Sequence, residues 1–215
     1  MIQEWLKKSE SIPRKHGLYR MEAILEALGN PERELKSIHI AGTNGKGSTA
    51  AMITAFAKAH GLRVGTFTSP HMDSIRERIQ LDGVPLEEEP FWQAASVVRE
   101  VERRLFEEWG SFNYFEILTA MMFVVFQQEA VDLAIIEVGI GGLLDNTNVG
   151  HPLVSVITTI GLDHQDLLGS SLEEITAQKA GIIKSGQQVV VGPVSCECMD
   201  VIHEVASEKG ATVQA

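Results

Sequence analysis

The sequence has little cysteine and no long hydrophobic run. Its two cysteines, Cys196 and Cys198, are separated by one residue, and two cysteines cannot make a disulfide scaffold of a 215-residue chain. No apolar stretch approaches the roughly 18 residues that a membrane-spanning helix needs. The charged N-terminal segment, residues 1–15, lacks the apolar region of a secretory signal. We therefore expect ordinary thiols, no membrane partner and a cytoplasmic location.

Basic residues are also scarce. The chain has 18 lysines and arginines against 29 aspartates and glutamates, which gives a formal net charge of −11. Such a charge repels a phosphate backbone at long range, so we expect no nucleic-acid partner. A bound polyanion such as ATP would need local help from backbone N–H groups, a lysine or a divalent cation.

What the sequence does contain is an alternation of short apolar runs and helical stretches. This predicts the α/β class with a mainly parallel sheet flanked by helices, and the length fits one domain, residues 1–215. Predicted strands lie at residues 37–41, 63–68, 132–138, 153–160 and 188–191. Predicted helices lie at residues 21–28, 49–60, 88–109, 115–128, 172–183 and 196–209. Residues 70–89 are predicted to form a long loop with a short strand at 78–81.

A glycine-rich segment lies between the first predicted strand and the helix that follows, which is the setting of a phosphate-binding loop. It comprises Gly42, Thr43, Asn44, Gly45, Lys46, Gly47 and Ser48. Glycines let backbone N–H groups face a phosphate, and Lys46 can reach the terminal phosphates. The loop is a variant of the Walker pattern, because Ile40 stands at the first glycine position and Gly47 at the Ser/Thr position. The alternative is a glycine-rich turn that only joins a strand to a helix.

Four polar residues lie at or near the ends of predicted strands and helices: Ser69, Glu137, His164 and Lys179. Ligands of open α/β sheets bind beyond the carboxyl ends of the strands, so Ser69, Glu137 and His164 could meet the phosphate loop, with Lys179 on the same side of the sheet. A carboxylate at the end of an apolar strand calls for a cation or a donor, and Mg²⁺ prefers oxygen ligands and nucleotide phosphates. Taken singly, Glu137 could be a satisfied carboxylate and His164 a loop histidine. The remaining histidines, His71 apart, and the acidic stretch 87–89 are interpreted as surface or packing residues.

Several motifs in order along the chain resemble one family. They are GTNGKGS at 42–48, TSPH at 68–71, ERI at 77–79, FE at 115–116, TA at 119–120, EVGIGG at 137–142, DNTN at 145–148, GLDH at 161–164 and KAGIIK at 179–184. Together they resemble the ATP-binding domain of folylpolyglutamate synthase and dihydrofolate synthase, relatives of the Mur peptide ligases. The resemblance implies a P-loop NTPase-like fold of the Mur ligase central-domain type.

The resemblance also implies an activity. ATP would phosphorylate a folate carboxylate, and the amine of L-glutamate would displace phosphate from the acyl phosphate, as in a tetrahydrofolate synthase. By motif position, Lys46, Glu137, His164 and Lys179 would be catalytic. Ser69, Glu137 and His164 would hold Mg²⁺, with Lys179 carbamylated to add an anionic group.

The substrate site implied by the resemblance consists of His71, Phe115, Asp145 and Asn146. Phe115 would stack on the pterin ring, Asp145 would accept hydrogen bonds from its edge, and the loop 69–78 would cover it. Asn146 stands where some relatives carry alanine, so dihydrofolate synthase activity stays open. The family's Gly-Gly-Arg-Leu-Asp and Glu-Lys-Ala-Gly patterns are altered here at Leu143 and Gln178.

Members of this family have a C-terminal domain that helps to hold ATP and the incoming glutamate. We expect this chain to lack it, to be a monomer, and to be inactive or weakly active alone. Two alternatives are a Mur-type peptide ligase of cell-wall synthesis and a non-catalytic nucleotide-binding module. The TSPH segment argues against the first, and the joint presence of Ser69, Glu137, His164 and Lys179 disfavours the second.

Overall fold

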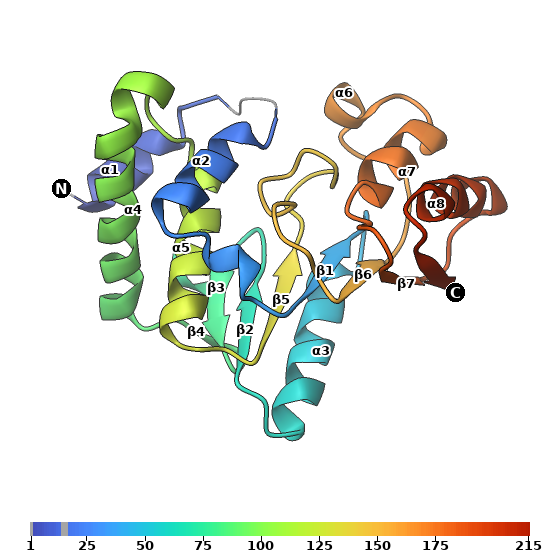
Figure 1. Cartoon of the computed structure of the whole chain (residues 1–215), viewed down its shortest axis with the longest axis horizontal. Coiled ribbons are helices and arrows are strands. Elements are labelled where there is room, and N and C mark those ends of the chain that lie inside the picture. The colour runs from blue at the N-terminus through green and yellow to red at the C-terminus, as the bar shows by residue number, and fades with distance from the viewer. Residues whose placement is uncertain (1, 14–16) are drawn as a thin grey trace.

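The fold is built around a mostly parallel sheet (Figure 1). The structure is a computed structural model, and it describes residues 2–13 and 17–215. Its eight described strands run in the order β4-β3-β2-β5-β1-β6-β7-β8. The strands are β1 (Ser37–Ala41), β2 (Val64–Phe67), β3 (Ile79–Leu81), β4 (Val84–Pro85), β5 (Leu133–Glu137), β6 (Val154–Ile157), β7 (Gln188–Val191) and β8 (Thr212–Gln214). Strand β3 pairs antiparallel with both β2 and β4, and the other pairs among the described strands are parallel. The predicted α/β class and mainly parallel sheet are confirmed.

Helices cover both faces of the sheet. They are α1 (Ile2–Ser9), α2 (Tyr19–Ala27), α3 (Lys46–Ala59), α4 (Glu88–Trp109), α5 (Tyr114–Gln128), α6 (Gln165–Leu168), α7 (Leu172–Ala180) and α8 (Cys196–Glu208), with short 3-10 turns η1 (Pro31–Arg33) and η2 (Ile75–Arg78). Among the described residues, no helix is both long and apolar enough to cross a membrane. Arg14 and Lys15, part of the charged segment considered above, lie outside the described residues.

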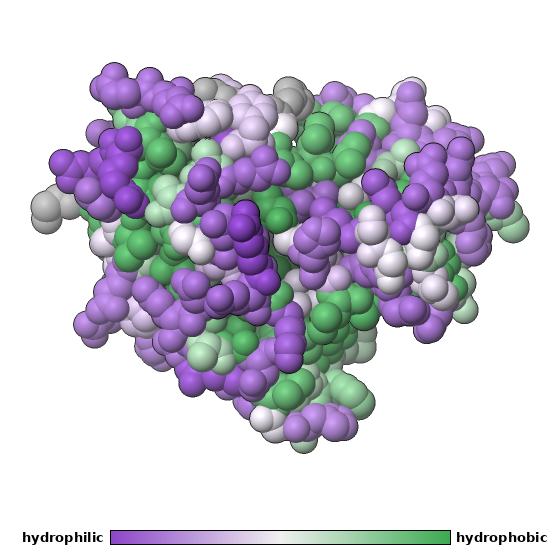
Figure 2. All heavy atoms as spheres, viewed as in Figure 1, coloured by the Kyte–Doolittle hydropathy of each residue, from purple (hydrophilic) through white to green (hydrophobic). Residues whose placement is uncertain are grey.

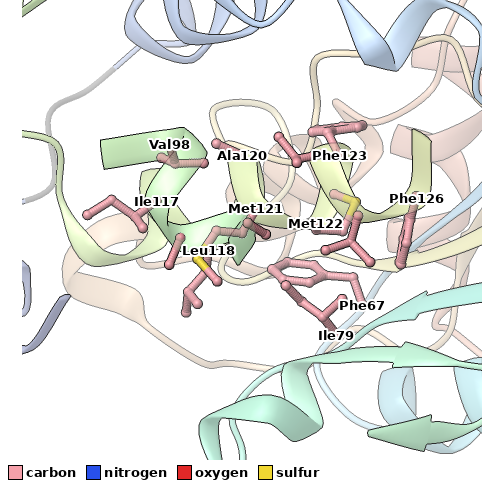
Figure 3. Packing of buried hydrophobic residues seen from close by; sticks show 14 of the residues in the cluster. Phe67, Ile79, Val98, Ile117, Leu118, Ala120, Met121, Met122, Phe123 and Phe126 are labelled. Atoms are coloured by element: carbon pink, nitrogen blue, oxygen red, sulfur yellow. The ribbon is translucent and has the colours of Figure 1, made fainter. Parts of the chain in front are cut away.

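The alternation of side chains along the central strands divides the core between the two faces. Ile135 of β5 packs with residues of α3, whereas its neighbours Ala134 and Ile136 belong to the cluster that contains α5. Figure 3 shows Phe67 of β2 next to Ile79 of β3, under a row of α5 side chains. Residues 115–126 of α5 are all buried, because α5 packs between the sheet and α4.

Helix α3 is different, because only one of its sides contacts the sheet. Met52 and Phe56 on its outer side are 65% and 69% exposed. Figure 2 shows hydrophobic residues gathered over this helix in the lower part of the view. Helix α3 therefore presents apolar surface both to the sheet and away from it.

A buried ion pair joins α2 to the start of α5. Arg20 Nε donates to Glu116 Oε1 over 2.7 Å, and both side chains are 2% exposed. The same arginine donates to the carbonyls of Trp109 and Ser111 at the end of α4. Because the guanidinium and the carboxylate are both satisfied, the pair can stay charged inside the protein.

The structure departs from the predicted elements where strands are short and polar. The short strand predicted at 78–81 is confirmed as β3, but the segment around it is not one long loop, because η2 precedes β3 and the unpredicted strand β4 follows it and extends the sheet. Strand β8, with exposed Thr212 and Gln214, and the helices α1 and α6 were not predicted. The strand predicted at 153–160 ends at Ile157. After it, Thr158 N still donates to Ala41 of β1, whereas the Thr158 hydroxyl and the Thr159 carbonyl bond to the glycine-rich loop.

Candidate functional site

The glycine-rich loop joins the carboxyl end of β1 to the first residue of α3. Gly45 is the N-cap of α3 and has φ +83°, a conformation that favours glycine, and α3 begins at Lys46, three residues earlier than predicted. At Gly42, φ is +148° and a Cβ atom would lie 1.9 Å from Thr158 Oγ1. The loop therefore brings the N–H groups and positive dipole end of a 14-residue helix to the edge of the sheet.

The segment after β6 holds this loop in place. Thr158 Oγ1 donates to the carbonyl of Asn44 over 2.7 Å. Thr43 N donates to the carbonyl of Thr159 over 2.8 Å, and Asn44 N donates to Thr159 Oγ1 over 3.0 Å. Sequence reasoning missed both threonines. The sequence pattern that could have identified them is a pair of hydroxyl residues directly after an apolar strand, at the edge of the sheet where the ends of parallel strands meet.

Two lysines from distant parts of the chain meet at one oxygen of the loop. Lys46 Nζ donates to the carbonyl of Gly42 over 3.0 Å, and Lys179 Nζ donates to the same carbonyl over 3.1 Å. Lys179 is 3% exposed. Its burial, and next the positive charge of Lys46, lower its pKa to about 8, while the negative charge of Asp163 opposes the shift. The site thus contains an amine that is partly neutral at mildly alkaline pH.

A buried carboxylate lies close to Lys46. Glu137 closes β5, is 4% exposed, and accepts a hydrogen bond of 3.1 Å at Oε2 from the backbone N–H of Ser69. Burial raises the pKa of Glu137, while the Ser69 N–H and the charges of Lys46 and Arg78 favour its ionised form. A Cβ atom at Gly47 would lie 3.6 Å from Glu137 Oε2, so the first turn of α3 passes directly beside this carboxylate.

His164 lies nearer the surface than the other three residues of the predicted metal set. It is the N-cap of α6, with a left-handed backbone conformation, and its Nε2 lies 3.7 Å from Asp163 Oδ2. The described residues contain no group of three or more His, Cys, Asp or Glu side chains placed to hold a metal ion. The structure thus joins Ser69, Glu137 and Lys179 to the loop region, and the role of His164 stays a prediction.

A small cavity of about 110 Å³ opens among α5, α6 and the glycine-rich segment after β5. Phe115, Asp145 and Asn146, which were predicted to share a substrate site, all line it. The Phe115 ring lies against Gly139, where a Cβ atom would come within 2.6 Å of it. Gly139 follows Glu137 by two residues, so one segment links the cavity to the buried carboxylate.

The segment after β2 contacts Glu137 through Ser69. Glu77 accepts hydrogen bonds from the backbone N–H groups of Met72, Asp73 and Ser74, which fixes this segment. Arg78 Nε donates to His71 Nδ1 over 2.9 Å. The described lining of the small cavity does not include His71, so its substrate contact stays a prediction.

Comparison with known proteins shows which family the chain belongs to. The Mur ligase middle domain family matches residues 40–214. The chain is 40% identical over 215 residues to the dihydrofolate synthase/folylpolyglutamate synthase of Bacillus subtilis (strain 168), and the match covers 99% of this chain and 50% of that protein. It is 43% identical over 194 residues to the folylpolyglutamate synthase of Lacticaseibacillus casei, which covers 89% of this chain and 45% of that protein. The chain spans about half the length of these relatives.

Solved structures agree with this result. A folylpolyglutamate synthase from Thermotoga maritima superposes with a TM-score of 0.91 at 38% identity, covering 99% of this chain and 49% of that one. A structure described as the FPGS-AMPPCP-folate complex superposes with a TM-score of 0.92 at 40% identity, covering 99% of this chain and 53% of that one. The predicted resemblance and the Mur-type fold are confirmed. The chain therefore belongs to the Mur ligase middle domain family, and its relatives in that family are folylpolyglutamate synthases.

Proposed function

We propose that this chain is the ATP-binding part of a folylpolyglutamate synthase, an ATP-dependent ligase that adds L-glutamate to the carboxylate of folate. The observation that carries the proposal is that Lys46 and Lys179 both donate to the carbonyl of Gly42, with Glu137 close to Lys46 and the cavity of Phe115 lined by the segment that follows Glu137. Relatives named for this activity, and a solved relative described as a complex with AMPPCP and folate, support it.

Nucleotide binding would use the loop and the start of α3. A triphosphate is attracted by the N–H groups and the dipole of α3, and Lys46 would neutralise its terminal phosphates. A carboxylate at neutral pH is a poor electrophile, so the γ-phosphoryl group has to be aligned with it before transfer. The amine of glutamate then attacks the acyl carbon, and phosphate leaves. Lys179 would add positive charge beside the transferring group, or an anionic group once carbamylated.

The residues present fit Mg²⁺. This ion is usually bound by one or two carboxylates together with substrate phosphates and water, so it does not need a cluster of acidic side chains. Glu137 supplies a buried carboxylate whose raised pKa shows that its charge is not fully compensated, and Ser69 supplies a hydroxyl next to it. Bound there with His164, the ion would neutralise phosphate charge.

The pterin part of folate would occupy the small cavity. The Phe115 ring offers a face for stacking, and the carboxylate of Asp145 accepts hydrogen bonds only, which suits the N–H groups of a pterin. Asn146 lies beside them in the cavity lining. Because the segment that lines the cavity follows directly after Glu137, the last residue of β5, the folate tail would lead toward the phosphate loop.

Two experiments test the proposal. Isothermal titration calorimetry of the chain with AMPPCP and Mg²⁺ is expected to show binding that Lys46→Ala weakens at least about tenfold, which is about 1.4 kcal/mol. Lys58→Ala is the matched control, because Lys58 lies on the same helix and its Nζ contacts the carbonyl of Asp82, away from the loop. Equal binding by the two variants would contradict the role of Lys46.

The activity is tested on the chain joined to the C-terminal half of the Bacillus subtilis relative. We expect ATP-dependent addition of glutamate to tetrahydrofolate and none to a muramyl precursor. Addition to the muramyl precursor would favour a Mur-type peptide ligase, and binding of ATP without turnover of either acceptor would favour a nucleotide-binding module. Dihydropteroate as a third acceptor tests dihydrofolate synthase activity.

A further inference from the structure

A buried histidine, His39, contacts the segment after β5 that lines the small cavity. His39 is in β1, pairs with Ile136 of β5 and Ser155 of β6, and is 2% exposed. Its burial, with a smaller effect from the positive charge of Lys184, lowers its pKa to about 3. The imidazole is therefore neutral, and one ring nitrogen carries a proton while the other does not.

The hydrogen bonds around Thr147 determine where that proton is. His39 Nε2 lies 2.8 Å from Thr147 Oγ1, and Thr147 Oγ1 lies 2.7 Å from Asp145 Oδ1. A carboxylate only accepts hydrogen bonds, so the hydroxyl proton of Thr147 is directed to Asp145. The hydroxyl oxygen can then only accept from the imidazole, which places the proton of His39 on Nε2.

These hydrogen bonds end at Asp145, which lines the cavity. Asp145 Oδ1 also accepts the backbone N–H of Thr147 over 3.1 Å, and Oδ2 accepts the backbone N–H of Ile140 over 3.0 Å. The carboxylate is 4% exposed, so its orientation depends on these bonds rather than on water. Two of these four hydrogen bonds join side chains, from His39 to Thr147 and from Thr147 to Asp145. These two link the cavity wall to the centre of the sheet.

We propose that His39 is a positioning residue for the folate site: by donating from Nε2 to Thr147 it holds the carboxylate of Asp145 in the orientation that receives the N–H groups of a pterin ring. This inference rests on the proposed function, because it takes folate as the occupant of the cavity. His39 itself does not touch the ligand. Its effect reaches the cavity through Thr147, whose single hydroxyl proton is committed to Asp145.

The test uses the 215-residue chain saturated with AMPPCP and Mg²⁺ and titrated with folic acid. His39→Leu removes the donor, and we expect folate affinity to fall at least about fivefold, which corresponds to about 1 kcal/mol for one lost hydrogen bond. His39→Gln can place an amide N–H near the position of Nε2 and is expected to restore most of the affinity. AMPPCP affinity is expected to be the same in all variants.

Two further measurements separate positioning from a general loss of structure. Thr147→Val removes the hydroxyl at nearly constant volume, and we expect the same loss of folate affinity as for His39→Leu. Nitrogen–proton correlation NMR of the unchanged chain is expected to show the His39 proton on Nε2. A proton on Nδ1, or equal folate affinity in all variants, would overturn this inference alone. No folate binding by the unchanged chain would overturn the proposed function, and this inference with it.

Discussion

His39 also makes the stability of the chain depend on pH. Its pKa is about 3 in the folded chain and about 6.5 when the chain unfolds. Between these values the unfolded state binds a proton that the folded state does not bind, so stability falls as the pH drops below 6.5. For these two pKa values, the free energy of unfolding falls by about 2 kcal/mol between pH 7.5 and pH 5 because of this residue alone.

Urea unfolding followed by circular dichroism measures this effect at the two pH values. Other groups also titrate in this range, so the comparison is with His39→Gln, which keeps a donor but cannot be protonated. We expect the loss of stability from pH 7.5 to pH 5 to be about 2 kcal/mol larger in the unchanged chain than in this variant. Thr147→Val keeps the imidazole and should retain most of the pH dependence. If the unchanged chain and His39→Gln lose the same stability, the imidazole is not buried in a neutral form.

Three other changes test the site and its support. Gly42→Ala should lower the free energy of unfolding in urea by about 1–3 kcal/mol, because its Cβ atom would collide with Thr158; an unchanged midpoint would contradict this packing. Arg20→Met should cost about 3–5 kcal/mol in the same assay because it leaves Glu116 buried without its partner, and Arg20→Met combined with Glu116→Gln should recover much of that loss. Glu137→Gln should abolish most of the gain in AMPPCP affinity that Mg²⁺ gives over EDTA, about tenfold, in calorimetry; a retained gain would exclude Glu137 as a ligand.

The parts of the fold that were predicted correctly are those whose determinants are local. The apolar strands, the glycine-rich loop and the buried helix α5 are each specified by neighbouring residues, and all were found. Strands β4 and β8 are two and three residues long and largely exposed, so they carry no apolar signal of their own. They form because a neighbouring strand offers free backbone groups, and that information lies elsewhere in the chain.

In the candidate site, too, the residues with local sequence signals could be predicted and those that depend on distant partners could not. Lys46 could be found from its loop, but its neighbour Lys179 is 133 positions later. Its place near the end of a predicted helix put it in the candidate set, and only the resemblance to a family gave it a role. The sequence indicates for His39 only a surface or packing residue, because a histidine within an apolar strand carries no signal for a partner. The bond from His39 to Thr147 spans 108 residues. No pattern within a window of the sequence indicates such a pairing.

Under the proposed function, the two lysines would let an acidic protein hold an anion. The net charge of −11 repels a nucleotide at long range, so attraction has to come from the site itself. Lys179 is buried beside Lys46, and its lowered pKa means that the surrounding protein groups do not fully compensate its charge. A phosphate chain on the loop would compensate both ammonium groups, and binding it would therefore raise the pKa of Lys179. Carbamylation of Lys179 would act in the opposite sense, by replacing a positive charge with a negative one that favours a cation near Glu137.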